Sequence, residues 1–178
     1  MEIRAMHNPF ESLARNIIYQ QLHGNAAGAI HQRVRDLFGN SGRLKPEDIL
    51  NAPEDLLRRA GLSTAKTVAI KDLAAKTLDG TVPTLARLRR MEDEEIIERL
   101  TTVRGIGRWT VEMLLIFRLG RPDVLPVGDF AVRKGFMNVY GLKEQPKPRE
   151  LLQHGERWRP FRSVASWYLW RASEEKQR

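Results

Sequence analysis

Residues 100–115 read Leu-Thr-Thr-Val-Arg-Gly-Ile-Gly-Arg-Trp-Thr-Val-Glu-Met-Leu-Leu, and residues 127–130 read Val-Gly-Asp-Phe. A helical pattern runs into Gly105-Ile106-Gly107 and resumes at once, which predicts two helices joined by a tight turn. The amides that open the second helix, near Gly107 and Arg108, then form an anion site with the helix dipole behind them, and a DNA phosphate is its natural ligand. A glycine-closed helix pair that is only a corner has the same pattern, so Gly-x-Gly alone leaves both interpretations open.

Apolar residues at helical spacing flank this turn and give both helices a buried face. They are Leu100, Val103, Ile106, Val111, Leu114 and Leu115. The chain continues through a loop rich in proline and glycine, Gly120 to Gly128, which brings Asp129 to the start of a helix expected over Phe130–Tyr140. A carboxylate in this position is an N-cap or a catalytic group, and the spacing leaves both interpretations open.

Composition limits the classes of function. Lys and Arg total 30 against 22 Asp and Glu, a formal net charge of +8 in 178 residues, which favours a polyanionic partner. Because the chain has no cysteine, it has no disulfide and no cysteine-ligated iron–sulfur cluster. The four histidines lack metal-ligand spacing with carboxylates, so a zinc hydrolase is not expected. No apolar run approaches the roughly 18 residues that span a bilayer, and no signal-peptide core is found, so we expect an intracellular protein without a membrane contact.

Helical periodicity and helix-capping residues cover nearly the whole chain, and no stretch alternates long enough to predict a sheet. The sequence therefore predicts an all-α fold. Helices are expected over Phe10–Leu22, Asn25–Phe38, Pro46–Leu50, Pro53–Ala60, from Ser63 or Thr64 to about Leu78, and from Pro83, Asp93, Arg108, Asp129, Pro148 and about Pro160.

The run Gly105-Ile-Gly-Arg-Trp-Thr110, followed by Asp129, resembles the helix-hairpin-helix DNA glycosylases, and among them the 3-methyladenine glycosylases of alkylation repair. The similarity begins at Pro9-Phe-Glu11, continues through Tyr19-Gln-Gln-Leu-His23 and reaches residues 158–170, so it covers nearly the whole chain. It implies a two-lobed helical core of about ten helices without a sheet. The middle lobe would span about residues 40–125, and the helices of both termini would form the other lobe, with the active site in between.

The resemblance implies a monofunctional enzyme that flips an alkylated purine out of the duplex and hydrolyses its N-glycosidic bond, leaving an abasic site. Positive charge develops on the sugar as this bond breaks, and the ionised carboxylate of Asp129 would stabilise it. A purine such as 3-methyladenine is already cationic and leaves as a neutral base, so no general acid is expected. In bifunctional relatives a lysine stands at the position of Trp109 and attacks the sugar, so Trp109 predicts water as the nucleophile.

The resemblance also implies which residues hold the flipped base. Trp109, Trp170 and Met113 would line the base pocket, with the indole of Trp109 stacked on the cationic base. A core aromatic under the hairpin is the other interpretation of Trp109. The end of the first long helix would fill the gap in the duplex, with Gln21 as the closest match and His23 beside it. A polar helix end before Gly24 is the other interpretation of this segment.

The remaining DNA contacts are expected from the hairpin glycines, Gly105 and Gly107, and from Lys66 and Arg108. Either cation can equally be a solvated surface charge. No cofactor is expected to be required. Relatives hold a monovalent cation in the hairpin, and here Na⁺ or K⁺ would bind the main-chain carbonyls of three residues. They are Thr101, Val103 and Ile106.

The expected partner is double-stranded DNA that contains damaged bases, and the protein is expected to act as a monomer. It would lie in the cytoplasm or nucleoid of a bacterium, or in the nucleus of a eukaryote. Two other functions stay open from the sequence. A noncatalytic helix-hairpin-helix DNA-binding module would share the turn and the positive charge but would have no use for Asp129 in a pocket. A structural all-helical interaction protein would need neither DNA binding nor a pocket.

Overall fold

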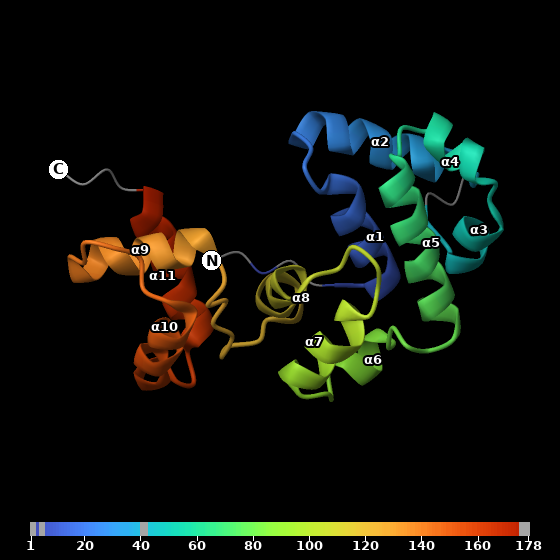
Figure 1. The fold of residues 1–178 in the computed structure, drawn as a ribbon. Coiled ribbons are helices and arrows are strands. Elements are labelled where there is room, and N and C mark those ends of the chain that lie inside the picture. Colours follow the sequence, from blue (N-terminus) through green and yellow to red (C-terminus); the bar gives the residue numbers. More distant parts are fainter. Residues whose placement is uncertain (1–2, 4–5, 40–42, 175–178) are drawn as a thin grey trace. The chain divides into compact units, whose positions relative to one another are not determined.

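The computed structural model describes residues 3, 6–39 and 43–174. Over these residues the chain forms eleven α-helices, one π-helical turn and one 3-10 turn, with no strand (Figure 1), so the expected all-α fold is confirmed. The helices are α1 (Pro9–Tyr19), α2 (Gly24–Asp36), α3 (Pro46–Asn51), α4 (Glu54–Arg59), α5 (Thr64–Leu78), α6 (Leu85–Leu88), α7 (Asp93–Thr101), α8 (Arg108–Leu114), α9 (Phe130–Tyr140), α10 (Pro148–Gly155) and α11 (Arg162–Glu174). The other turns are η1 (Leu115–Leu119) and η2 (Glu156–Trp158).

Two compact units make up the chain. Residues 6–108, which include α1 to α7, form one unit, and residues 109–174 belong to the other. The expected grouping of the helices of both termini in one lobe stays a prediction. No helix in the described ranges is long and apolar enough to cross a membrane.

The unit of residues 6–108 is built around α5, against which α1, α3 and α4 pack, and α1 also contacts α2 (Figure 1). Asn8 begins α1 as its N-cap by accepting a hydrogen bond from the Glu11 amide, and Pro9 follows at the first helical position. The apolar face of α1 is fully buried, as its spacing predicts. Its members are Phe10, Leu13, Ala14, Ile17 and Ile18.

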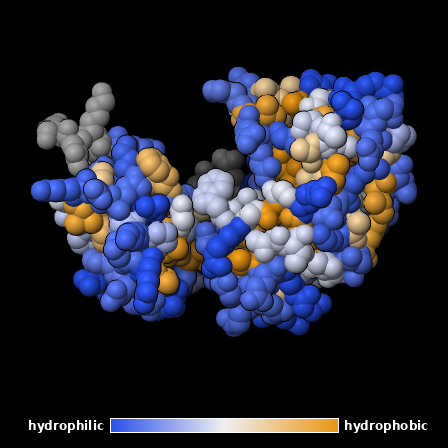
Figure 2. Space-filling model, viewed as in Figure 1, coloured by the Kyte–Doolittle hydropathy of each residue, from blue (hydrophilic) through white to orange (hydrophobic). Residues whose placement is uncertain are grey.

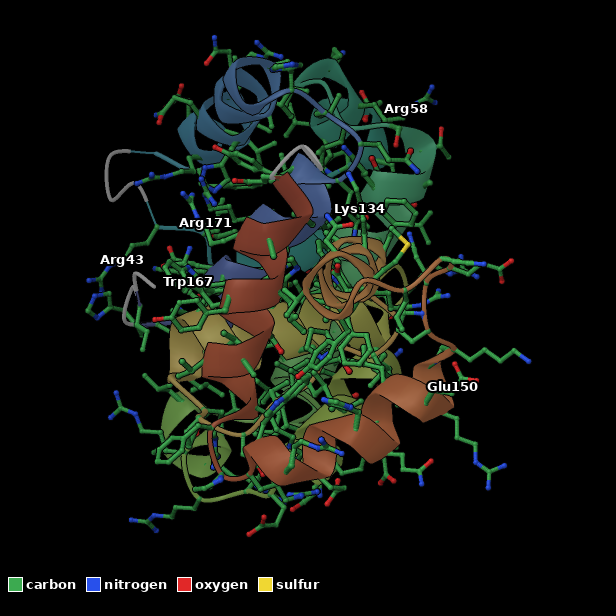
Figure 3. The ribbon with its side chains drawn as sticks, turned by 90° about the vertical axis from the view of Figure 1, so that its left-hand side faces the viewer. Arg43, Arg58, Lys134, Glu150, Trp167 and Arg171 are labelled. Atoms are coloured by element: carbon green, nitrogen blue, oxygen red, sulfur yellow. The ribbon has the colours of Figure 1, made fainter. Side chains whose placement is uncertain are left out.

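The unit of residues 109–174 depends on a close contact between α9 and α11 (Figure 3). A Cβ at Gly135 of α9 would lie 1.8 Å from the main-chain oxygen of Leu169 in α11, so only glycine allows the two backbones to meet there. Trp167 projects from the side of α11 that faces away from α9 (Figure 3). The core of the unit consists of Leu125, Val132, Phe136, Leu151 and Leu169.

The loop that leads to Asp129 is fastened to the beginning of α11. The guanidinium of Arg162 donates to the Asp123 carboxylate at 2.6 Å. The hydroxyl of Ser163 donates to the Arg121 carbonyl at 2.7 Å and accepts from the Val124 amide at 3.0 Å. Burial raises the pKa of Asp123, but the hydrogen bonds and charges of the neighbouring arginines outweigh it and leave the pKa below its usual value. The loop is therefore held in one conformation by charged and polar contacts.

Most helix starts agree with the expectations, and the ends differ more. Helix α9 spans Phe130–Tyr140 as predicted, with Asp129 as its N-cap. Helix α1 ends at Tyr19 rather than near Leu22, because Gln21 adopts a left-handed backbone conformation with φ 56°.

The visible surface is largely hydrophilic with separate hydrophobic patches (Figure 2). Phe130, at the start of α9, is an exposed aromatic residue.

Candidate functional site

The predicted hairpin turn lies between the end of α7 and the start of α8. Gly105 has φ +79°, which other residues adopt only with strain, and the Ile106 amide donates to the Val103 carbonyl at 3.0 Å. Gly107 does not have this conformation, and nothing lies within 4 Å of the place where a Cβ would stand. The two glycines therefore differ: Gly105 is required by the turn, whereas Gly107 keeps an outer surface open.

Side chains from distant helices hold this turn. Gln20, just after α1, donates from Nε2 to the Gly105 carbonyl at 2.8 Å. Asp72 of α5 accepts the Arg104 amide at 2.7 Å and the Lys76 ammonium at 2.8 Å, and Lys76 also donates to the carbonyl of Thr102 in the turn. Burial raises the pKa of Asp72, but these hydrogen bonds outweigh it and keep the pKa below its usual value. Asp72 is therefore charged at neutral pH and braces the turn.

The segment that follows α1 is anchored in the same unit. Lys66 of α5 donates from Nζ to the carbonyls of Ile18 and Gln20 at 2.8 and 2.7 Å. Burial lowers the pKa of Lys66. Because two of its three N–H donors are used in this way, its main contribution to the structure is to hold the end of α1, and its expected phosphate contact stays a prediction.

Gln21 and His23 lie just beyond this anchor. Among the described residues Gln21 is the single non-glycine residue with positive φ, and its side chain is exposed. A hollow of about 730 Å³ adjoins it, lined in part by Lys66, Arg104 and Gly105. His23 is exposed at the N-cap of α2 and makes no capping hydrogen bond with its side chain. The structure thus places Gln21 and the hairpin around one hollow, within one unit.

Arg108, expected to contact DNA, forms an ion pair in the free protein. Its guanidinium donates to both carboxylate oxygens of Glu94 on α7, at 2.7 and 2.8 Å. These hydrogen bonds hold the pKa of Glu94 below its usual range, so the pair is ionised at neutral pH. Both side chains are more than half exposed, so the pair adds little to the stability of the fold.

The Asp129 carboxylate lies in the other unit and is only 9% exposed. Its Oδ1 accepts the Val132 amide at 2.9 Å, which confirms the N-cap interpretation. Its Oδ2 accepts the indole N–H of Trp109 at 2.5 Å. Capping and catalysis are compatible, because each oxygen has lone pairs beyond the one used here.

The three residues expected around the base differ in their surroundings. Trp109 is 54% exposed, whereas a core aromatic would be buried. Met113 is half-buried one turn further along α8. Trp170 packs against Phe117, with ring centroids 5.6 Å apart, and against the core of its unit. The structure brings Trp109 to Asp129, while a pocket formed by all three side chains stays a prediction.

The carbonyls expected to bind a monovalent cation are partly engaged. The Val103 carbonyl accepts the Ile106 amide, and the neighbouring Thr102 carbonyl accepts the Lys76 ammonium. Within the described ranges no cluster of three His, Asp or Glu side chains could hold a metal ion. The hairpin cation stays a prediction.

Sequence reasoning missed the residues that brace the hairpin. Asp72 and Lys76 have the i,i+4 spacing of an ordinary helical ion pair, and Glu94 lies in an acidic first turn of α7. Neither pattern differs from that of a solvated helix surface. Only their contacts with residues 102, 104 and 108 show that Asp72, Lys76 and Glu94 hold the hairpin.

Known proteins with similar sequences and structures show the family of this chain. A DNA-3-methyladenine glycosylase 1 from Schizosaccharomyces pombe is 42% identical over 166 residues, which cover 93% of this chain and 73% of that protein. The solved structure of the S. pombe 3-methyladenine DNA glycosylase Mag1 in complex with abasic DNA has a TM-score of 0.78 at 41% identity and covers 97% of this chain and 85% of that chain. A DNA-3-methyladenine glycosidase from Bacillus halodurans has a TM-score of 0.88 at 38% identity, covering 98% of this chain and 79% of that one. Because residues 14–160 also match the family as a whole, the chain belongs to the HhH-GPD superfamily of base excision DNA repair proteins.

Proposed function

We propose that this protein is a monofunctional DNA glycosylase that releases alkylated purines such as 3-methyladenine and leaves an abasic site for base excision repair. The observation that carries the proposal is Asp129, a buried carboxylate with both oxygens held by hydrogen bonds. The protein belongs to a base excision repair family and is 42% identical to a named DNA-3-methyladenine glycosylase.

Asp129 acts on the charge that develops during bond cleavage. As the N-glycosidic bond breaks, the sugar becomes an oxocarbenium-like cation, and a nearby anion lowers the energy of that transition state. A cationic alkylated purine leaves as a neutral base without being protonated. The reaction therefore favours alkylated over undamaged purines, whose departure needs an acid.

Water completes the reaction in this proposal. An enzyme that cuts the strand needs an amine to attack the sugar, and the residue on Asp129 is the indole of Trp109 rather than a lysine. An indole nitrogen is a donor only and cannot act as a nucleophile at neutral pH. The product is thus an abasic site in an intact strand.

The hairpin would hold the DNA backbone through main-chain amides, with Gly107 allowing close approach. Gln21 is suited to fill the gap left by the flipped base, because it is exposed and lies on a turn that Lys66 fixes through the end of α1. His23 would contact the same strand region. The complex of Mag1 with abasic DNA supports DNA as the partner.

We propose that damaged double-stranded DNA is bound by a monomer and that no cofactor is required. A monovalent cation on the carbonyls of Thr101, Val103 and Ile106 remains part of the proposal. The protein would act where the DNA lies, in the nucleoid of a bacterium or the nucleus of a eukaryote.

Asp129→Asn should lower the single-turnover rate of base release from methylated duplex by at least about 10²-fold, because charge stabilisation in the transition state is lost. Affinity for abasic-site DNA should be little changed, since the phosphate contacts remain. Asp55→Asn is the matched control, because Asp55 lies in an exposed ion pair with Arg59. Duplex binding without base release by the wild-type protein would instead indicate a noncatalytic DNA-binding module.

Borohydride should trap no covalent complex between the wild-type protein and lesion DNA, because no amine forms a Schiff base with the sugar. The measurement is a gel shift under denaturing conditions after reduction, run beside a bifunctional glycosylase as a positive control. A stoichiometric adduct would show that another amine attacks the sugar and that the enzyme is bifunctional.

Gly107→Ala should leave the melting temperature nearly unchanged and weaken binding to damaged and undamaged duplexes alike, because its Cβ meets open space in the protein but stands where the phosphate must approach. Gly105→Ala should lower stability by about 1–2 kcal/mol, because φ is +79°. Gly28→Ala, at a position of α2 where the added Cβ would meet the Tyr19 hydroxyl at an ordinary contact distance of 3.5 Å, controls for the added methyl group. Unchanged affinity in a folded Gly107→Ala protein would mean that the hairpin is only a structural corner.

Glu94→Gln should increase duplex affinity and steepen the dependence of log K on log salt by about 0.9, because Arg108 then exchanges its carboxylate partner for a phosphate. Glu95→Gln removes the same charge from the same helix but breaks the Arg99 pair instead, and serves as the control. Affinity is measured across a salt series. Equal slopes for the two variants would show that Arg108 does not reach the DNA.

A further inference from the structure

The carboxylate of Asp129 has one hydrogen-bond donor on each oxygen. The Val132 amide reaches Oδ1 at 2.9 Å, and the Trp109 indole N–H reaches Oδ2 at 2.5 Å. The first donor belongs to the backbone of α9, and any N-capping residue would receive it. The second belongs to a side chain at the start of α8, so it is specific to the residue at position 109.

Both donors are electrically neutral. Among the described residues no Lys, Arg or His lies within ion-pair distance of Asp129, although the chain carries a net charge of +8. A cationic partner on this carboxylate would cancel much of the field that the developing sugar cation needs. An indole N–H orients the oxygen and replaces lost water without bringing a positive charge.

The orientation of the carboxylate depends on this second contact. The terminal torsion of an aspartate is broad and roughly two-fold, so a single hydrogen bond on Oδ1 leaves the position of Oδ2 loosely defined. Two donors on different oxygens define the carboxylate plane. The indole of Trp109 has a single N–H donor, which is used on Asp129, and its ring is 54% exposed, so this hydrogen bond helps to define the position of the ring.

We propose that Trp109 is a positioning residue that acts through its N–H: it orients the Asp129 carboxylate and leaves the negative charge available to the sugar cation. The inference rests on the proposed glycosylase function. It differs from a stacking role, in which the π-face of Trp109 acts on the base, and the two roles need different parts of the same side chain.

The decisive variant replaces Trp109 with 3-benzothienylalanine, which keeps the bicyclic ring and has sulfur in place of N–H. Its single-turnover rate of base release should fall by about 10- to 10²-fold, as expected when a reacting group is misplaced by up to about 1 Å. The rate of the Trp109→Phe variant should fall by at least the same factor. Affinity for abasic-site DNA should stay near that of the wild type. Trp167→Phe, at a half-buried position of α11, controls for the loss of an indole and should keep the wild-type rate. A benzothienyl variant with the wild-type rate would overturn the proposal.

A binding ratio tests the charge directly. We compare affinity for duplexes with a cationic pyrrolidine and with a neutral tetrahydrofuran at the abasic position, because the cation imitates the sugar in the transition state. Trp109→Phe and Asp129→Asn should each lower the ratio of the two affinities. The double variant should fall no further than Asp129→Asn alone, because the two residues act as one unit. Additive losses would overturn the proposal and assign Trp109 an independent contact with the DNA.

A measurement on the free protein separates this proposal from the proposed function. The indole N–H of Trp109 should exchange slowly with solvent in the wild type, and Asp129→Ala should accelerate its exchange. Slow exchange in a protein that releases no base would support the contact and refute the glycosylase. Fast exchange that is unaffected by Asp129→Ala, in a protein that releases base, would refute the positioning role alone.

Discussion

The hydrogen bonds on Asp129 are the constraint on which the reactive part of the molecule depends. A carboxylate that has lost most of its water is costly unless donors replace it, and here the Val132 amide and the Trp109 indole do so. Two structural features hold the Asp129 carboxylate in its place. Asp129 begins α9, which contacts α11 closely through Gly135, and the preceding loop is tied to α11 by Arg162 and its neighbours. The loop and the helices thus serve to place one charge.

The hairpin depends on a different kind of constraint. Its turn needs a left-handed glycine, but the turn is also braced by Asp72 and Lys76 of α5 and by Gln20, just after α1. Because these contacts come from α5 and from the end of α1, the hairpin and the turn at Gln21 share their supports. Recognition of a phosphate and filling of the gap in the duplex are therefore coupled through one framework in our proposal.

The chain has a formal net charge of +8, but several of its basic side chains already bind groups within the protein. Lys66 donates to carbonyls at and just after the end of α1, Lys76 to Asp72 and the hairpin, and Arg108 to Glu94. Both side chains of the Arg108–Glu94 pair are exposed, so Arg108 can exchange the carboxylate of Glu94 for a phosphate at little cost in stability. The basic side chains thus divide into those that shape the DNA-binding surface and those that can contact DNA.

The sequence by itself determined the local features, because they depend on residues close together in the chain. Periodic apolar residues and caps predicted the all-α fold, and the loop rich in proline and glycine before Asp129 predicted that Asp129 begins α9. The hairpin motif and Asp129 together indicated the family. Local patterns did not predict that α1 ends at Tyr19 or that Gly105 rather than Gly107 has positive φ. Both places also make hydrogen bonds with residues far away in the chain, from Lys66 to the end of α1 and from Gln20 to Gly105. Nor could local patterns pair Trp109 with Asp129 or Arg108 with Glu94. Hydrogen bonds that side chains make with residues 14 to 85 positions away leave no periodic trace in a sequence, so only the tertiary structure decided them.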